Sequence, residues 1–404
     1  MKKIIIVGAG ASGMMAAIAA ARQGASVTVL ERMEKAGKKL LITGNGRCNL
    51  TNKDLSVKNA YRGAGEDFVK QVLGQFHMED TLAFFRELGL LTRDRNGYVY
   101  PYTDQAGTVL ELLLQEIRRL KIKMKYGEKV TGIQKTEAGF QVQTATWSYS
   151  CDKVILCAGG KAAPQTGSDG SGYELAAACG HSLKPVYPAL VPLKAGGNLP
   201  RMLSGTRNQA VLSLEIDGKI RHREEGELQW TDYGVSGIVV FQLSRFAAEA
   251  LAKKKKVRLH VDLMPEYTAE EIEKMFVQKE ERFPEETAQE LLAGLLKKKT
   301  AAALVKTAGK KARAEKGQVF YRAALSFLKD LTLEITGTKS FDMAQVCAGG
   351  IPAEEVSAKT LESLRMPGLY LAGELLDVDA ICGGYNLQWA WSSGYTAGCR
   401  AGRE

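Results

Sequence analysis

The first hydrophobic and polar positions of the chain follow the order strand, helix, strand. Residues 3–7 form an apolar run typical of a buried strand, and residues 12–23 form an alanine-rich helical pattern that stops before Gly24. Residues 26–31 then repeat the strand pattern. This order predicts a β-α-β unit, whose helix can lie close to a sheet because its side chains are small.

The next part of the chain alternates between helical and strand patterns. Residues 32–52 show neither period and are expected to form a glycine-rich loop. Helical patterns then cover residues 66–74, 78–88, 108–120 and about 173–179, and strand patterns lie around residues 129–136, 140–146 and 153–156. This alternation is typical of a mixed α/β domain.

The pattern changes near residue 182 and again after residue 331. Prolines and alternating runs, among them residues 210–216, indicate a small β-rich insertion, and residues 268–330 have the pattern of charged helices. Strands and glycine turns return after residue 331 and lead into a last helix. We therefore expect the two ends of the chain to form one α/β domain that the middle interrupts.

Gly8, Gly10 and Gly13 form a G-x-G-x-x-G motif between the first strand and the first helix. In dinucleotide-binding folds the first glycine makes a tight turn, the second lets the backbone approach a pyrophosphate, and the third lets helix and strand pack. Ala11 and Ser12 fall at the helix N-terminus, whose N–H groups favour anions. The motif in this setting predicts a dinucleotide-binding site.

Glu31 ends the second strand, 18 residues after Gly13. A carboxylate at this position of the fold binds a ribose 2′-OH and repels a 2′-phosphate. The predicted ligand is therefore an adenine dinucleotide, and the carboxylate speaks against NADP.

Three distant segments favour FAD over NAD as this dinucleotide. Residues 32–52 are long enough to follow the phosphates and rings of an extended ligand. Residues 157–160 resemble the glycine turn that follows a strand in flavoproteins with two dinucleotide folds. Residues 373–374, followed by glycines 383–384 at a helix start, offer a second helix N-terminus for the side of the flavin where negative charge develops on reduction.

Composition narrows the class of protein further. The chain has 404 residues, of which 45% are hydrophobic and 25% charged, and this excludes collagen-like, disordered and disulfide-scaffold proteins. Its seven cysteines contain no C-x-x-C pair and its four histidines show no ligand spacing, so we expect a reducing compartment and no metal. No run is typical of a signal peptide or membrane span, which predicts a cytoplasmic protein with no membrane partner.

The formal net charge of +10 is concentrated in one segment. Residues 297–316 contain eight basic residues and one acidic residue. A solvated helical face explains them most simply, and the alternatives are a surface for nucleic acid or a lid for an anionic substrate. The absence of interleaved aromatic residues disfavours nucleic acid.

Two side chains are candidates for chemistry beside the flavin. Cys48 is either a redox thiol or, as we prefer without a resolving cysteine nearby, a packed one. Tyr385 either donates a proton to a substrate or only covers the ring. We assign no catalytic residue.

Four long motifs resemble one family, the BaiN-like flavoproteins, which include aminoacetone oxidases. The motifs are residues 44–52 (GNGRCNLTN), 231–237 (TDYGVSG), 360–363 (TLES) and 368–394, which contains GLYLAGELLDVDA and GGYNLQWAWSSG. The resemblance covers essentially the whole chain. The chain differs from the family at Asp232 and Cys347, where the family often has His and Thr. No histidine is therefore present at position 232 to transfer protons.

The resemblance implies an α/β fold of the Rossmann-like, two-dinucleotide-binding flavoprotein type, interrupted by a β-rich domain and a small helical domain. The expected segments are 1–185 and 336–404 for the FAD-binding domain, 186–262 for the β-rich insertion and 263–335 for the helical insertion. Together with the motifs above, it places the cofactor contacts on Gly8, Gly10, Ala11, Ser12, Gly13, Glu31, Arg32, Lys38, Lys39, Gly44, Asn45, Gly46, Arg47, Cys48, Asn49, Val130, Ala158, Gly159, Gly373, Glu374, Asp377, Gly384, Tyr385, Asn386 and Leu387.

These observations predict an FAD-dependent oxidoreductase that exchanges hydride between flavin N5 and a small organic substrate. The family implies two reactions: reduction of an unsaturated steroid such as a bile-acid intermediate, or oxidation of an amine of the aminoacetone type by O2. NAD(P)H is the candidate electron donor for the first. It would bind transiently, because residues 167–172 are spaced wrongly for a second fingerprint. A non-catalytic flavoprotein or nucleic-acid-binding module that uses the 297–316 patch is the further alternative, and the oligomeric state stays open.

Overall fold

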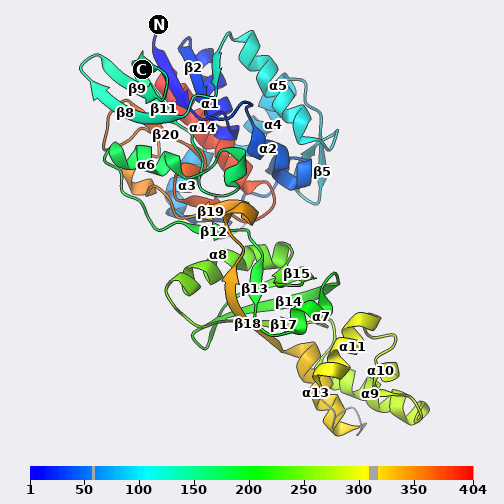
Figure 1. Cartoon of the computed structure of the whole chain (residues 1–404). Coiled ribbons are helices and arrows are strands. Elements are labelled where there is room, and N and C mark those ends of the chain that lie inside the picture. The colour runs from blue at the N-terminus through cyan, green and yellow to red at the C-terminus, as the bar shows by residue number, and fades with distance from the viewer. Residues whose placement is uncertain (57–59, 309–316, 404) are drawn as a thin grey trace. The chain divides into compact units, whose positions relative to one another are not determined.

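The computed structural model describes residues 1–56, 60–308 and 317–403 (Figure 1). The chain divides into two compact units. Unit 1 comprises Met1–Tyr187 and Gln345–Glu404, and unit 2 comprises Pro188–Ala344. Unit 1 thus contains both ends of the chain, drawn in blue to green and in orange to red in Figure 1.

Unit 1 is an α/β structure. Its N-terminal part contains β1 (Lys3–Val7), α1 (Ala11–Arg22), β2 (Ser26–Glu31), α2 (Lys38–Ile42), η1 (Thr43–Gly46), β3 (Thr51–Asn52), β4 (Tyr61–Gly63), α3 (Glu66–Leu73), α4 (Met78–Glu87), β5 (Thr92–Arg95), β6 (Tyr98–Pro101), α5 (Ala106–Arg119), β7 (Lys123–Tyr126), β8 (Val130–Thr136), β9 (Gly139–Thr144), β10 (Ser148–Cys151), β11 (Lys153–Leu156), η2 (Pro164–Thr166) and α6 (Ser171–Ala178). Its C-terminal part contains β19 (Val346–Ala348), η4 (Ala353–Glu355), β20 (Leu369–Leu371), η5 (Gly373–Leu375), β21 (Val378–Ala380) and α14 (Tyr385–Arg403).

A five-stranded sheet with the order β20-β11-β1-β2-β7 forms the centre of unit 1. Every neighbouring pair in it is parallel. The register places Ile5 of β1 between Thr28 of β2 and Val154 of β11. β20 comes from the far end of the chain and pairs with β11, so the two ends share one sheet, and the predicted Rossmann-like α/β fold is confirmed.

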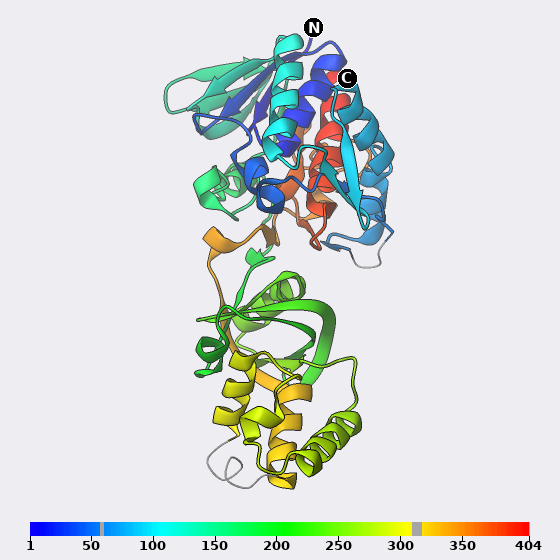
Figure 2. The ribbon, with the colours of Figure 1, turned by 90° about the vertical axis from the view of Figure 1, so that its right-hand side faces the viewer.

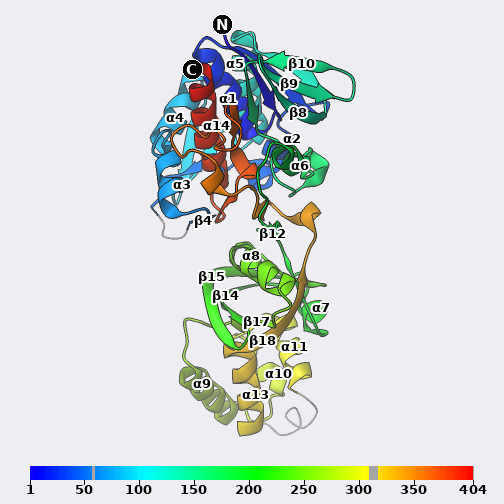
Figure 3. The ribbon, with the colours of Figure 1, turned by 90° about the vertical axis from the view of Figure 1, so that its left-hand side faces the viewer.

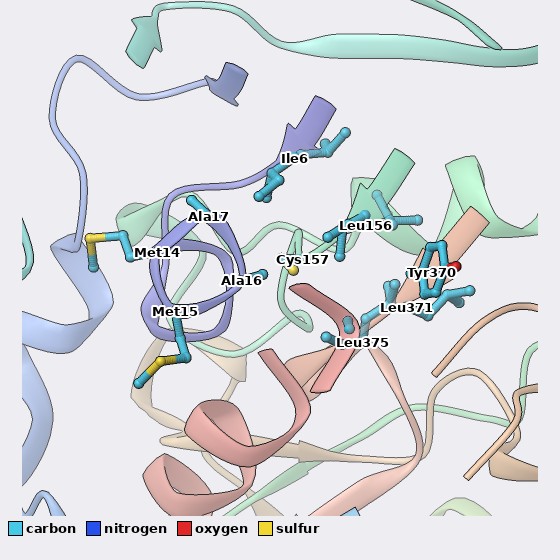
Figure 4. Packing of buried hydrophobic residues seen from close by; sticks show 14 of the residues in the cluster. Ile6, Met14, Met15, Ala16, Ala17, Leu156, Cys157, Tyr370, Leu371 and Leu375 are labelled. Atoms are coloured by element: carbon cyan, nitrogen blue, oxygen red, sulfur yellow. The ribbon is translucent and has the colours of Figure 1, made fainter. Parts of the chain in front are cut away.

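α1 and α14 pack closely against each other beside this sheet (Figure 1). Glycines make the contact possible, because a Cβ on Gly394 would lie 2.3 Å from the Ser12 carbonyl oxygen. A Cβ on Gly398 would lie 2.3 Å from the carbonyl oxygen of Ala16. Figure 4 shows the α1 side chains near Ile6, on β1, and near the apolar residues of β11 and β20. The helix that begins at the glycine motif is therefore fixed between sheet and C-terminal helix.

Unit 2 contains a closed barrel with the strand order β13-β16-β15-β14-β17-β18 (Figure 2). The barrel strands are β13 (Leu193–Ala195), β14 (Arg207–Ile216), β15 (Lys219–Thr231), β16 (Gly234–Ser236), β17 (Val257–Asp262) and β18 (Leu331–Thr338), and β12 (Tyr187–Ala189) straddles the boundary of the units. The helices are α7 (Leu199–Leu203), α8 (Ile238–Ala252), α9 (Ala269–Arg282), α10 (Ala288–Leu291), α11 (Lys298–Thr307), α13 (Gln318–Lys329) and η3 (Phe341–Met343), several of which are labelled in Figure 3. Among the described residues, no helix is long and apolar enough to cross a membrane.

The structure corrects one expectation about local structure. The segment expected to be a loop over residues 32–52 contains α2 and η1. The insertion expected to be β-rich contains the strands β13 to β17 and also the long helix α8, which buries apolar side chains such as Leu243 against the barrel. β18 pairs with β17 and β13 and belongs to unit 2, and the expected start of the second FAD-binding segment at residue 336 stays a prediction. The separation of β-rich and helical insertions at residue 262 stays a prediction.

Candidate dinucleotide-binding site

A cleft in unit 1 opens at the carboxyl ends of β1, β2 and β11 and encloses about 1260 Å³ of unfilled space, part of it open to solvent. Val7, Glu31 and Cys157 mark the three strand ends in its lining. Ligands of open parallel sheets bind at this edge, beyond the carboxyl ends of the strands.

The three glycines of the motif have separate roles in the cleft. Gly8 has a φ of 101°, and a Cβ there would lie 2.5 Å from the Cys157 carbonyl oxygen, so the turn requires glycine. A Cβ on Gly13 would lie 1.9 Å from the Gly8 carbonyl oxygen, which makes the contact of helix and turn dependent on glycine. A Cβ on Gly10 would meet no atom within 4 Å. Gly10 therefore borders open space, as a pyrophosphate approaching the backbone requires.

Glu31 is buried at the end of β2 and lines the cleft. Its carboxylate accepts a hydrogen bond from the Ala9 N–H at 2.7 Å and another from the Met33 N–H at 2.8 Å. The side chain thus ties the glycine turn to the end of β2. A carboxylate has further acceptor positions, which leaves Glu31 able to accept from a ribose hydroxyl.

Two ion pairs border the cleft. Lys39 on α2 binds Glu374 on η5, with 2.6 Å between the Nζ and Oε2 atoms, and Oε1 of Glu374 accepts from the Cys347 N–H at 2.9 Å. Arg32 pairs with Asp169. Burial raises the pKa of Asp169, but the hydrogen bonds from Ser171 and Arg32 lower it more, to about 2. Asp169 is therefore ionised at neutral pH and holds the guanidinium near the strand end.

The cleft collects many of the predicted contact residues. Its lining includes Gly8, Gly10, Ala11, Ser12, Glu31, Arg32, Lys38, Lys39, Val130, Ala158, Gly159, Glu374, Asn386 and Leu387. Gly13, Gly44, Asn45, Gly46, Arg47, Cys48, Asn49, Gly373, Asp377, Gly384 and Tyr385 lie outside that lining. For all of them, direct contact with a cofactor stays a prediction.

Three of the residues outside the lining are buried or hydrogen-bonded elsewhere in unit 1. Burial raises the pKa of Cys48 to about 12, so this thiol stays protonated at neutral pH, which agrees with a packed cysteine. The Tyr385 hydroxyl donates to the Asp54 carbonyl oxygen at 2.8 Å, and burial raises its pKa to about 12. Asp377 accepts from the Gly349 N–H at 3.1 Å and pairs with Lys184.

The predicted contact residues did not include the rest of the lining. These residues are Val7, Ala9, Leu30, Lys35, Gly37, Leu40, Thr43, Glu128, Lys129, Cys157, Thr166, Gly167, Ser168, Ser171, Leu175, Gln345, Val346, Val378, Trp389 and Ala390. Trp389 is buried, with its indole N–H donating to the Gly373 carbonyl oxygen at 3.0 Å. Gly167 and Ser171 belong to a glycine-rich turn whose spacing does not match the dinucleotide-binding motif. Nothing in the local sequence therefore predicted that they line the cleft.

The basic segment of residues 297–316 lies partly outside the described residues. Within the described part, the Nζ atoms of Lys297 and Lys299 donate to the carbonyl oxygens of Arg207 and Ser204. These two lysines hold α11 against neighbouring backbone. Among the described residues, no group of three or more His, Cys, Asp or Glu side chains could hold a metal ion.

The glycine turn, the parallel sheet and the acidic residue at the end of β2 define a dinucleotide-binding protein of the Rossmann class. The chain belongs to the HI0933-like family, because the family model described as "HI0933-like protein Rossmann domain" matches residues 2–400. The family resemblance of the sequence motifs is thereby confirmed.

Named relatives align with the whole chain. It is 45% identical over 409 residues to the 3-dehydro-bile acid delta(4,6)-reductase of Clostridium scindens, covering 100% of both chains. It is 28% identical over 397 residues to the ribosomal RNA dihydrouridine synthase of Escherichia coli, covering 97% of this chain and 96% of the relative. Among solved structures, 3-ketosteroid delta1-dehydrogenase from Sterolibacterium denitrificans matches with a TM-score of 0.51 and 14% identity over 100% of both chains, which shows a shared fold.

Proposed function

We propose that the protein is an FAD-dependent oxidoreductase that reduces a carbon–carbon double bond conjugated to a carbonyl group. A steroid of the bile-acid class is the leading substrate. The observation that carries the proposal is the 45% identity, over full length, to a relative named as a bile-acid delta(4,6)-reductase. The predicted oxidoreductase activity agrees with that name.

The residues of the cleft fit an adenine dinucleotide. Gly10 leaves room for a pyrophosphate at the N-terminus of α1, where N–H groups and the helix dipole favour negative charge. Glu31 is held rigidly by the Ala9 and Met33 N–H groups and can accept from a ribose hydroxyl. Bound FAD would supply hydride-transfer chemistry.

The chain's own groups would bind and orient this cofactor. Asn386 and Leu387 at the start of α14 line the same cleft as the N-terminus of α1, so two helix N-termini contribute to one site. The Asn386 side chain is fixed by its own hydrogen bonds, since its Oδ1 accepts from the Ala380 N–H and its Nδ2 donates to the Ala380 carbonyl, both at 2.9 Å. Such a rigid helix start suits stabilisation of charge on a reduced ring.

NAD(P)H is the electron donor that we propose. Gly167 and Ser171 belong to the cleft lining, so the glycine-rich stretch between them serves the first dinucleotide. The sequence contains no second fingerprint that follows a strand. A nicotinamide donor would therefore bind only transiently.

The test begins with the absorbance of the purified protein. We expect the flavin bands, bleaching of these bands by NADH or NADPH without oxygen, and recovery on addition of a 3-oxo-Δ4,6 bile acid, with mass spectrometry showing two hydrogens added to the steroid. A colourless protein that does not take up added FAD would contradict the proposal that FAD is the cofactor. Bleaching by aminoacetone, followed by H2O2 formation in air, would favour the amine-oxidase alternative instead.

Uridine in ribosomal RNA is a second candidate substrate. Relatives named ribosomal RNA dihydrouridine synthase from Escherichia coli and Haemophilus influenzae are each 28% identical to nearly the whole chain. Formation of dihydrouridine also adds two hydrogens to a double bond conjugated to a carbonyl, so the same cofactor chemistry serves both reactions. Unmodified ribosomal RNA incubated with protein and NAD(P)H, then digested and analysed by mass spectrometry, distinguishes this substrate from the steroid.

A further inference from the structure

Two tyrosines of β6 in unit 1 contact two glycine loops that are far apart in sequence. β6 pairs with β3 and β5 in a regular register, so Tyr98 and Tyr100, two positions apart, point to the same face of the strand. A Cβ on Gly383 would lie 2.5 Å from the Cε1 atom of Tyr98. A Cβ on Gly44 would lie 3.6 Å from the Cε1 atom of Tyr100. The two side chains, which we call the tyrosine pair, therefore contact one loop each.

Both loops continue the wall of the cleft. Thr43 lines the cleft, and Gly44 follows it directly in the chain. Gly383 precedes the start of α14, where Asn386 lines the cleft. The Gly383 carbonyl oxygen accepts from the Asn52 side chain at 2.9 Å, which fixes this loop to β3 next to β6. The tyrosine pair therefore borders the cleft on the side that Thr43 and Asn386 line.

The hydroxyl groups of the tyrosine pair contribute no hydrogen bond to the fold. Tyr98 and Tyr100 are half-buried, and neither hydroxyl has a hydrogen-bond partner within residues 1–56, 60–308 and 317–403. Two nearby tyrosines differ in this respect. The Tyr61 hydroxyl donates to the Tyr385 carbonyl oxygen at 3.0 Å, and the Tyr385 hydroxyl donates to the Asp54 carbonyl oxygen at 2.8 Å. Contact with the glycines explains the rings of the pair but not their hydroxyls, since phenylalanine would pack there equally well.

The surroundings of Tyr100 suit an oxygen atom that gains negative charge. Burial and the neighbouring Tyr98 raise the pKa of Tyr100. The charges of Arg95 and Arg47 lower this pKa by less, so the hydroxyl is a hydrogen-bond donor at neutral pH. The Arg95 guanidinium lies 5.5 Å from the centroid of the Tyr100 ring and pairs with Asp104 at 2.6 Å. Arg47 is exposed and forms no ion pair with any described residue, so its positive charge is not neutralised.

We propose that the hydroxyls of the tyrosine pair donate hydrogen bonds to the carbonyl oxygen of the substrate. The inference rests on the proposed reduction of a double bond conjugated to a carbonyl group, with NAD(P)H as the source of the two electrons. When hydride adds to the β-carbon, a C–H bond forms there and the electrons of the double bond move toward the carbonyl oxygen. Water then supplies the proton that completes the α-carbon. Because the oxygen is most negative during this step, the hydrogen bonds accelerate the reaction more than they strengthen binding.

Tyr98→Phe and Tyr100→Phe in the full-length holoprotein test the proposal. The probe is a 3-oxo-Δ4,6 bile acid with a 13C label at the carbonyl, which binds to the oxidised protein without being reduced. Infrared difference spectra should show its carbonyl band at lower wavenumber in the unchanged protein than in either variant, because a hydrogen bond weakens the C=O bond. At saturating steroid, the rate of reduction should fall about 100-fold in each variant, with a much smaller change in steroid affinity.

Tyr102→Phe is the matched control. Tyr102 follows two residues after Tyr100, is exposed, and contacts the Arg93 guanidinium through its ring, which phenylalanine preserves. Neither the carbonyl band nor the rate should change in this variant. Circular dichroism and flavin content confirm that all three variants are folded.

The possible failures are distinguishable. If the unchanged protein reduces the steroid while both variants of the tyrosine pair keep its carbonyl band and rate, the inference is overturned and the proposed function stands. Equal losses in the pair and in Tyr102→Phe would also overturn the inference. A protein that takes up FAD but neither binds nor reduces the steroid would contradict the proposed function itself, and the inference with it.

Discussion

At the scale of single residues, Glu31 holds the glycine turn and is the proposed acceptor for a ribose hydroxyl of FAD. Replacing Glu31 by Gln keeps the shape of the side chain and removes its charge. We expect FAD affinity to fall at least about tenfold, because a hydrogen bond to a charged group contributes about 1.5–3 kcal/mol. Fluorescence quenching of FAD titrated with the apoprotein measures this change, and the ratio of flavin to protein absorbance checks the occupancy.

The control for Glu31 is Glu128→Gln. Glu128 also lines the cleft, so this variant has the same charge change at the same site. Its carboxylate accepts from the Thr146 hydroxyl and also interacts with the Tyr149 hydroxyl, and it makes no contact with the glycine turn among the hydrogen bonds of the described residues. Equal losses of affinity in the two variants would show that overall charge, rather than the ribose contact, determines binding. Glu31→Ala is less informative, because it removes the acceptors of both the Ala9 and the Met33 N–H groups and destabilises the turn itself, whereas the Gln side chain keeps one acceptor for these two groups.

His181 makes the stability of unit 1 depend on pH. Its ring is buried, with Nδ1 2.9 Å from Glu355 and Nε2 2.8 Å from the Ser363 hydroxyl. Burial lowers the pKa of His181 more than Glu355 raises it. The unfolded state therefore takes up this proton first, so the contribution of His181 is present above about pH 6.5 and is lost as the pH falls through the folded-state pKa.

We expect this titration to appear in the difference between the unchanged protein and His181→Asn. The melting temperature of the unchanged protein should exceed that of the variant at pH 7.5, and the gap should narrow toward pH 5.5. Taking the difference removes His260, whose pKa is raised by Asp330 and Glu215 despite partial burial and whose effect has the opposite sign. A gap that does not change with pH would contradict the assignment.

At the scale of elements, the packing of α1 on α14 depends on glycine. We expect Gly398→Ala to destabilise the protein by about 1–3 kcal/mol, because the added Cβ overlaps the Ala16 carbonyl oxygen and the backbone must move. Urea unfolding followed by circular dichroism measures this loss. Gly107→Ala in α5 is the matched control, since a Cβ there meets no atom within 4 Å and alanine favours a helix by about 1 kcal/mol. Similar losses in both variants would contradict the role of the close contact.

Sequence alone predicted the elements whose causes are local. β1, α1 and β2 follow from a continuous apolar run, small helical residues and the glycine turn between them, and they end within about one residue of expectation. The closure of the barrel depends on pairing of β18 with β17, across an insertion of helices, and no local pattern specifies it. The helix α8 was not predicted, because its segment was interpreted from the prolines and the strand patterns that precede it.

The candidate site likewise contains some residues that the sequence predicted and others that it did not. Gly8, Gly10 and Glu31 follow a fixed spacing and lie in the cleft as predicted. Asp169, which holds Arg32, lies far away in sequence and reaches the site only because β11 pairs beside β1. Side chains that are brought together by the order of strands in a sheet leave no short-range signal.

At the scale of the whole molecule, the two units have separate hydrophobic cores. One core is built from residues of unit 1 alone and the other from residues of unit 2 alone. A ligand that binds only a folded unit stabilises that unit. Because the cleft lies entirely in unit 1, FAD is expected to act on one core and not on the other.

Calorimetry of the apoprotein should therefore show two unfolding transitions. FAD at about 100 times its Kd adds about 2.7 kcal/mol to the unit that binds it, so one transition should move to higher temperature while the other stays in place. In Glu31→Gln the shift at the same FAD concentration should be smaller, which assigns the moving transition to unit 1. A single transition that moves as a whole on addition of FAD would show instead that the two cores unfold together.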